Sequence, residues 1–151
     1  MSILTVASGK SIWRGYEYYL DKKVICYNEV DNLIYDGKIS GSGNHVYDVH
    51  LDINHLRKTT CNCPHAFGKR IICKHAIALY FTIFPDEAKD YYNQVVAYEE
   101  EEAKRQEEAE TKLDEYINSL TKEELRNVVY ELLYDSPAWV QDRFIQEHVD
   151  W

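Results

Sequence analysis

Two closely spaced pairs of metal-binding residue types constrain this chain more than any other feature. Cys61 and Cys63 are separated by one residue, Cys73 and His75 are separated by one residue, and nine residues lie between the two pairs. Thiolate and imidazole groups at this spacing surround single tetrahedral ions, and zinc prefers such ligands. The competing interpretation is a chance cluster of buried cysteines, which rarely reproduces metal spacing. We therefore expect one zinc ion bound by Cys61, Cys63, Cys73 and His75.

The ligand set indicates a structural centre. Four protein ligands complete a tetrahedron, whereas a catalytic zinc keeps one position for water. Three thiolates leave the centre negatively charged and a poor Lewis acid, so metal-assisted hydrolysis is not expected. One alternative stays open, because His65 would share a face with Cys61 and Cys63 in an extended segment and could replace His75 or support it. We favour His75, which opens an apolar stretch, Ala76 to Phe84, that is typical of a buried helix.

The segment from Cys61 to His75 reads CNCPHAFGKRIICKH, and its Cys-x-Cys and Cys-x-His pairs resemble the SWIM-type zinc finger. The resemblance covers roughly residues 10–82. It implies a zinc-binding module for DNA or protein contact, found alone or fused to Swi/Snf-type helicases, Mutator-type transposases or ubiquitin-ligase-like proteins. The positions that are similar to bacterial members are Pro64, Lys74, the run Arg14–Tyr19 with Val24, and the turn Gly41–Gly43.

Periodicity predicts an α+β fold for the first part of the chain. We expect a short helix over Ser11–Leu20, capped by its first residue and with its aromatic side chains in the core. Strands are expected over Val24–Asn28 and Leu33–Ser40. Apolar and polar residues alternate over 47–53, which predicts a third strand, half-buried with a polar outer face. These strands should form a small antiparallel sheet that leads to Cys61, and the zinc site should lead into a helix.

The pattern changes to helical after residue 85, and we expect three parts: a zinc-finger domain over 1–85, a charged helical linker over 86–120 and a C-terminal helical pair over 121–151. The linker has almost no apolar residue over 99–112, but oppositely charged pairs at i,i+4 can sustain a solvated helix there. A capping box at Thr121–Glu124 and Ser136-Pro137 should start the two final helices. An isolated helical pair is marginal, so it should fold back on the finger or bind a partner.

Charge is distributed unevenly along the chain. The net charge is −9, with −12 over residues 86–151 and −2 over residues 1–53, whereas residues 54–85 carry +5 and no acidic residue. A basic segment permits phosphate contact and an acidic tail opposes it, although charge runs are often only solvated surfaces. The possible nucleic-acid contacts are Arg57, Lys58, Lys69, Arg70 and Lys74.

Motifs of common enzyme classes are not found in the sequence: it has no glycine-rich phosphate loop and no GxSxG nucleophile. A redox role for Cys61 and Cys63 is disfavoured, because zinc would occupy both thiols. A disulfide in so short a loop would be strained, and no signal pattern or membrane-length apolar run is present, so we expect a cytoplasmic location.

We expect a non-enzymatic adaptor that contacts a protein partner, without a membrane or a small-molecule substrate. The alternative is a DNA-binding zinc finger that uses the basic surface 57–74, as an accessory to a helicase or transposase.

Overall fold

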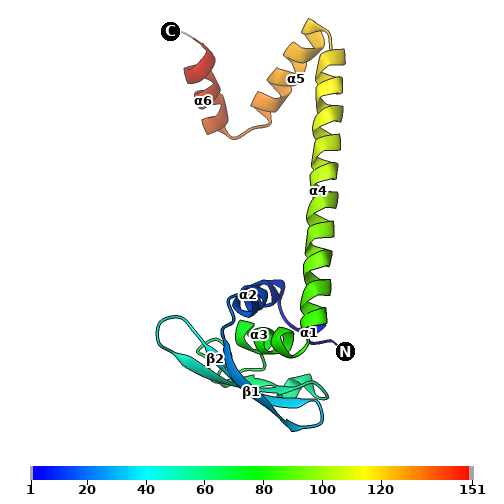
Figure 1. Cartoon of the computed structure of the whole chain (residues 1–151). Helices are drawn as coiled ribbons and strands as arrows, with labels where there is room; N and C mark the ends of the chain where they lie inside the picture. The colour runs from blue at the N-terminus through cyan, green and yellow to red at the C-terminus, as the bar shows by residue number, and fades with distance from the viewer. Residues whose placement is uncertain (1, 150–151) are drawn as a thin grey trace. The chain divides into compact units, whose positions relative to one another are not determined.

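A computed structural model describes residues 2–149 and divides the chain into two compact units, Met1–Val95 and Val96–Trp151 (Figure 1). The first unit holds helices α1 (Ile3–Val6), α2 (Gly9–Leu20) and α3 (Lys74–Ile83), with a sheet between α2 and α3 in sequence. Helix α4 (Pro85–Ser119) begins in the first unit and continues into the second, which also holds α5 (Lys122–Tyr134) and α6 (Ala138–His148). None of the helices within residues 2–149 has the length and hydropathy that crossing a bilayer requires.

The sheet is an antiparallel meander in the order β1-β2-β3-β4, as expected for an α+β fold. Its strands are β1 (Val24–Asp31), β2 (Ile34–Ser40), β3 (Val46–Asp52) and the short β4 (Thr60–Cys61). Strand β2 alternates buried and exposed residues, and its buried Tyr35 and Ile39 face Leu51 and Tyr47 of β3. One face of the sheet therefore turns to the core.

Helix α3 is the centre of the first unit (Figure 1). Its Ile77, Leu79 and Phe81 are each 0% exposed. The helix packs on the sheet at Gly37, where an added Cβ would lie 2.9 Å from a methyl carbon of Leu79. On its other side α3 packs against α2. The predicted buried helix over 76–84 is confirmed, and it begins two residues earlier.

Helix α2 differs from the sequence prediction in its cap and in its buried face. Ser8, not Ser11, is the N-cap, and its hydroxyl accepts a hydrogen bond from the Ser11 amide. Tyr16 is buried, but Trp13 and Leu20 are 40% and 57% exposed, so the expectation that all the aromatic face lies in the core is wrong. The face of α2 that meets α3 contains Gly15, which permits the two helices to approach closely. Because Gly15 has no side chain, the apolar pattern of the sequence does not reveal this face.

The polar outer face predicted for the third strand is wrong at one position, because Asp52 is 2% exposed. Its side chain accepts a hydrogen bond from the His55 amide at 2.7 Å, and its own amide donates to the Thr59 hydroxyl at 3.1 Å. The buried carboxylate thus organises the turn that leads from β3 to β4. His50 lies on the outer face as expected, 2.7 Å from a carboxylate oxygen of Asp36.

The second unit is built from exposed helices. The predicted capping box is present, with Thr121 and Glu124 bonded reciprocally at the start of α5. Pro137, rather than Ser136, is the residue before the first turn of α6. The charged stretch 99–112 is helical throughout as part of α4. The predicted helical pair over 121–151 is present as α5 and α6, and its last two residues lie outside the described residues.

Candidate metal centre

Strand β4 and the residue that follows it place the first pair of sulfurs. Cys61 pairs with Val49 of β3, on the inner face of the sheet. Asn62 points the other way, and its amide oxygen accepts from the Asp48 amide at 2.9 Å while its own backbone N–H donates to the Asp48 carbonyl at 3.2 Å. Asn62 therefore clamps the segment to β3 with Cys61 and Cys63 both turned inward, where they are 5% and 2% exposed.

The start of α3 places the second pair. Cys73 is the N-cap of the helix, and His75 lies in its first turn. Both side chains are buried, at 1% and 3% exposed. A ligand in the first turn of a helix whose later residues fill the core has little freedom to move, so the second pair is held by the packing of α3.

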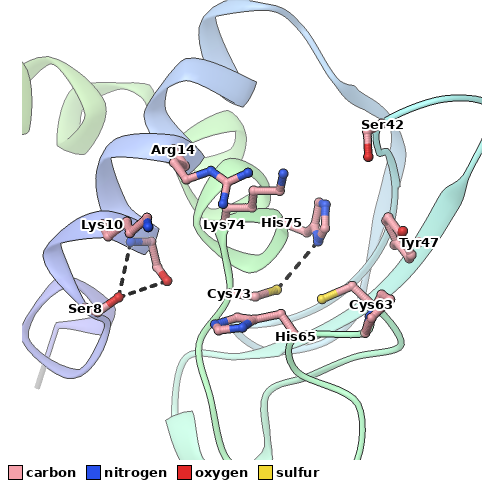
Figure 2. Close-up of a pocket in the computed structure, with 12 residues that line it drawn as sticks. Ser8, Lys10, Arg14, Ser42, Tyr47, Cys63, His65, Cys73, Lys74 and His75 are labelled. Carbon is pink, nitrogen blue, oxygen red and sulfur yellow. Dashed lines mark hydrogen bonds between the residues drawn. The ribbon is translucent and has the colours of Figure 1, made fainter.

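The four predicted ligands meet at one point. Their ligand atoms all lie within 4.8 Å of one another. Nδ1 of His75 lies 3.8 Å from the Cys61 sulfur and 3.7 Å from the Cys73 sulfur, the second of which is drawn in Figure 2. In a tetrahedron with Zn–S of about 2.3 Å and Zn–N of about 2.0–2.1 Å, the edge between sulfur and nitrogen is about 3.6 Å. The donor set and its spacing therefore fit one structural zinc ion, with Nδ1 as the histidine ligand.

His65 lies outside this group. After Cys63 the chain turns, with the amides of Ala66 and Phe67 both donating to the Cys63 carbonyl. The extended conformation therefore ends at Cys63, and His65 does not share a face with Cys61 and Cys63. His65 is exposed, whereas Ala66 is buried. The backbone passes Gly68 at a φ of +69°, which glycine adopts without strain.

Two of the sulfurs are electrostatically unequal before metal binds. A hydrogen bond from the Cys61 thiol lowers the pKa of Cys73 to about 4, helped by His75 and the Ala76 amide. The same hydrogen bond, together with burial, raises the pKa of the Cys61 thiol. Cys73 is therefore an ionised ligand at neutral pH, whereas Cys61 must lose its proton when zinc binds.

Aromatic rings enclose the imidazole, a feature that the sequence did not reveal. The ring of Tyr47 lies 4.6 Å from that of His75, and the ring of Tyr18 lies 5.4 Å away and edge-on. Tyr47 comes from β3 and Tyr18 from α2, so nothing in the local spacing connects them to His75. Nε2 of His75 is buried and has no hydrogen-bond partner among the described residues.

The five basic residues expected to contact nucleic acid do not share one surface. Arg57, Lys69 and Arg70 border a shallow hollow of about 740 Å³ over β2, β3 and the turn after Cys63. Lys74 instead lines a different cavity, at the start of α3. Lys58 is exposed and borders neither.

Comparison with known families agrees with this geometry. Residues 47–84 match the SWIM zinc finger. The chain contains a SWIM zinc finger. The match begins in β3 and ends just after α3, so it includes both ligand pairs and the elements that hold them. The chain has no significant match among curated proteins or solved structures.

The zinc finger yields a direct prediction about the histidine. We expect His75→Ala to lower the zinc content of the purified protein well below one ion per chain, because a Cys₃ set leaves the fourth position to water. His65→Ala, the matched control, should retain a full ion because His65 is exposed. Elemental analysis after purification under reducing conditions without chelator measures both. Full zinc in His75→Ala and loss in His65→Ala would reverse the assignment.

Proposed function

We propose that the protein is a non-enzymatic adaptor in which the zinc finger is the folded anchor and the C-terminal helices contact a protein partner. The exposure of those helices carries the proposal. No described residue of α5 or α6 is buried. Leu132 and Trp139 are each 65% exposed, and Tyr134 is 76% exposed. Large apolar side chains gathered on short helices are typical of surfaces that bind another protein.

The closed zinc site supports the non-enzymatic part of the proposal. Four protein ligands leave no position for a substrate or water on the metal. All four ligands are also buried, which limits access to the sulfurs. The ion would then contribute to folding rather than to chemistry.

The adaptor proposal predicts that charge on the apolar helices abolishes partner binding. Leu132→Asp combined with Trp139→Asp should remove a specific protein from the set captured out of the native host, because a buried unpaired carboxylate at an interface costs several kcal/mol, roughly a hundredfold or more in affinity. The matched control is Asn127→Asp with Gln146→Asp, which adds the same charge at exposed polar positions of the same helices. Quantitative mass spectrometry of the captured proteins and circular dichroism of each variant are the measurements.

Capture of the same proteins by the wild type and by the Leu132/Trp139 variant would contradict the proposal. So would a homodimer that the same substitutions dissociate, with no captured protein, since the face would then serve self-association.

Nucleic-acid binding is the second candidate, and the hollow bordered by Lys69 and Arg70 favours it. Phe67 is 71% exposed there, close in sequence to Lys69 and Arg70, a combination suited to stacking a base and contacting a phosphate. Asp36 and Asp48 border the same hollow, but His50 and Lys38 already pair with them.

If the second candidate holds, a fragment of residues 1–95 should bind DNA more tightly than the full chain, because it lacks most of the acidic residues. Charge reversal at Lys69 and Arg70 should abolish that binding, and each lost phosphate contact should lower the salt slope by about one unit. Fluorescence anisotropy at several salt concentrations measures both effects. Lys22→Glu combined with Lys89→Glu is the charge-matched control, because both residues are exposed and border neither hollow. A fragment that fails to bind DNA at low salt would eliminate this candidate.

A further inference from the structure

A cavity of about 420 Å³ lies beside the zinc site, on the side of α2 (Figure 2). Its walls come from the starts of two helices. Ser8, Lys10 and Ser11 line it from the first turn of α2, and Cys73, Lys74 and His75 line it from the first turn of α3. Helix N-termini present unpaired backbone N–H groups and partial positive charge, so two of them facing one cavity favour an anion.

The side chains at this cavity add positive charge. Lys10 and Arg14 lie one turn apart on α2, and Lys74 approaches from α3 (Figure 2). Among the described residues, no acidic side chain lines the cavity, and neither helix has an acidic residue in its first turn. Within residues 2–149, none of the three cations forms an ion pair.

Lys74 is held in place without being neutralised. Its ammonium donates to the Tyr18 hydroxyl at 2.7 Å and lies 4.2 Å from the centre of the same ring. Both contacts fix the position of the charge, and neither supplies a negative charge of its own. The ammonium keeps further N–H groups for a ligand.

His75 provides a second, independent sign of a ligand. It is 3% exposed, and its Nε2 has no hydrogen-bond partner in the described part of the chain. With Nδ1 on the metal, Nε2 carries the proton, and metal-bound histidines almost always donate that N–H to an acceptor. Figure 2 shows this nitrogen on the side of the ring away from Cys73, towards Lys74 and Ser42.

The negative charge of the zinc centre does not cancel the positive charge of the side chains at the cavity. Three thiolates around a divalent ion leave one negative charge, against the three cations of Lys10, Arg14 and Lys74. The remaining positive charge suits a dianion. A phosphate monoester carries about −1.5 to −2 charges near neutral pH and three acceptor oxygens, which match donors converging from α2, α3 and the imidazole.

We propose that this cavity binds the phosphate monoester group of a small organic molecule or of a nucleic-acid 5′ end. The volume is within the usual range of ligand pockets, about 300–1,000 Å³, and leaves space for the group that bears the phosphate. The ring of Tyr47 forms part of the wall available to that group. The site is separate from the hollow bordered by Lys69 and Arg70, so the two can be tested independently.

The test is a titration of the zinc-loaded full chain, followed by nuclear magnetic resonance, with inorganic phosphate, adenosine 5′-monophosphate, adenosine and a 5′-phosphorylated oligonucleotide. Phosphate and the monophosphate should shift resonances of residues 8–14 and 73–75 and the Nε2–H signal of His75, and adenosine should not. Tighter binding of the oligonucleotide than of the mononucleotide would show that the cavity takes the 5′ end of a nucleic acid. Tighter binding of the mononucleotide would show that it takes a small phosphorylated molecule. Equal binding of adenosine and its monophosphate, or no binding of any phosphate compound at millimolar concentration, would overturn the proposal.

Two double variants distinguish a specific phosphate site from non-specific electrostatic attraction. Lys10→Gln combined with Arg14→Gln should weaken monophosphate binding by roughly tenfold or more, because each removes a charge-assisted hydrogen bond. Lys22→Gln combined with Lys89→Gln removes the same charge from exposed residues of the first unit that do not line the cavity, and should leave the affinity nearly unchanged. Zinc content should be equal in all variants. Equal weakening in the two pairs would overturn the assignment of the cavity.

Discussion

Complete removal of zinc is expected to unfold the first unit of the protein, and Cys73→Ser is expected to have the same effect. Structural zinc contributes about 10–16 kcal/mol of apparent binding free energy in finger peptides near neutral pH. Domains of ordinary size are stable by only about 5–15 kcal/mol in total. Loss of the ion therefore removes a contribution as large as the whole stability of such a unit.

The position of the ligands extends the effect beyond the finger itself. Residues 62–73 form no strand or helix, and they are fixed between Cys63 and Cys73, which are both ligands. His75 belongs to α3, whose side chains fill the core between α2 and the sheet. We therefore expect the loss of structure to extend from residues 56–84, around the ligands, to α2 and the sheet.

Hydrogen exchange with and without chelator measures this effect. Protection should disappear over 56–84 and also over α2 and β2, which belong to the same unit, while α5, with its own capping box, should change little. Cys26→Ser is the matched control, because Cys26 is exposed and is not a member of the ligand group. Unchanged protection at 56–84, with elemental analysis showing that all zinc is gone, would contradict the prediction.

The parts of the fold that the sequence predicted are those governed by local chemistry. Paired ligands at short spacing, the capping box at Thr121 and the alternation over 47–53 each depend on a few neighbouring residues, and the structure contains all three. The errors depend on distant partners. Trp13 looked like a core residue by helical spacing, but the buried face of α2 is decided by its fit to α3.

The candidate site also combines features that the local sequence predicts with features that depend on distant partners. Residue type and spacing identified the ligand atoms, but only the turn after Cys63 decides between His65 and His75. A charge count grouped Lys74 with Lys69 and Arg70, although the start of α3 directs Lys74 into a different cavity. Lys10 and Arg14 belong to that cavity through the packing of α2 on α3, which no local pattern in the sequence expresses.

Gly15→Ala is expected to destabilise the first unit, although the same change in an exposed helix normally stabilises by about 1 kcal/mol. A Cβ at this position would lie 2.5 Å from two side-chain carbons of Ile77 and 2.9 Å from the backbone carbonyl oxygen of Lys74. The Lys74 carbonyl oxygen belongs to the backbone and cannot rotate out of the way, so α2 must shift away from α3. Overpacking of a core typically costs about 1–3 kcal/mol, which exceeds the gain in helix propensity. Urea unfolding of the zinc-loaded protein measures the difference.

Gly9→Ala is the matched control for this prediction, because it is the same substitution in the same helix. A Cβ at Gly9 would meet nothing within 4 Å. That variant should keep or raise the wild-type free energy of unfolding, since Ala favours the helix and meets no steric obstacle, whereas Gly15→Ala should lower it. The substitution at Gly15 should also weaken zinc binding. An added Cβ would press on Lys74, which lies between the ligands Cys73 and His75. We therefore expect Gly15→Ala, but not Gly9→Ala, to lose zinc to a competing chelator faster than the wild type. Equal stability of the two variants would mean that α2 and α3 are not packed as closely as the structure shows.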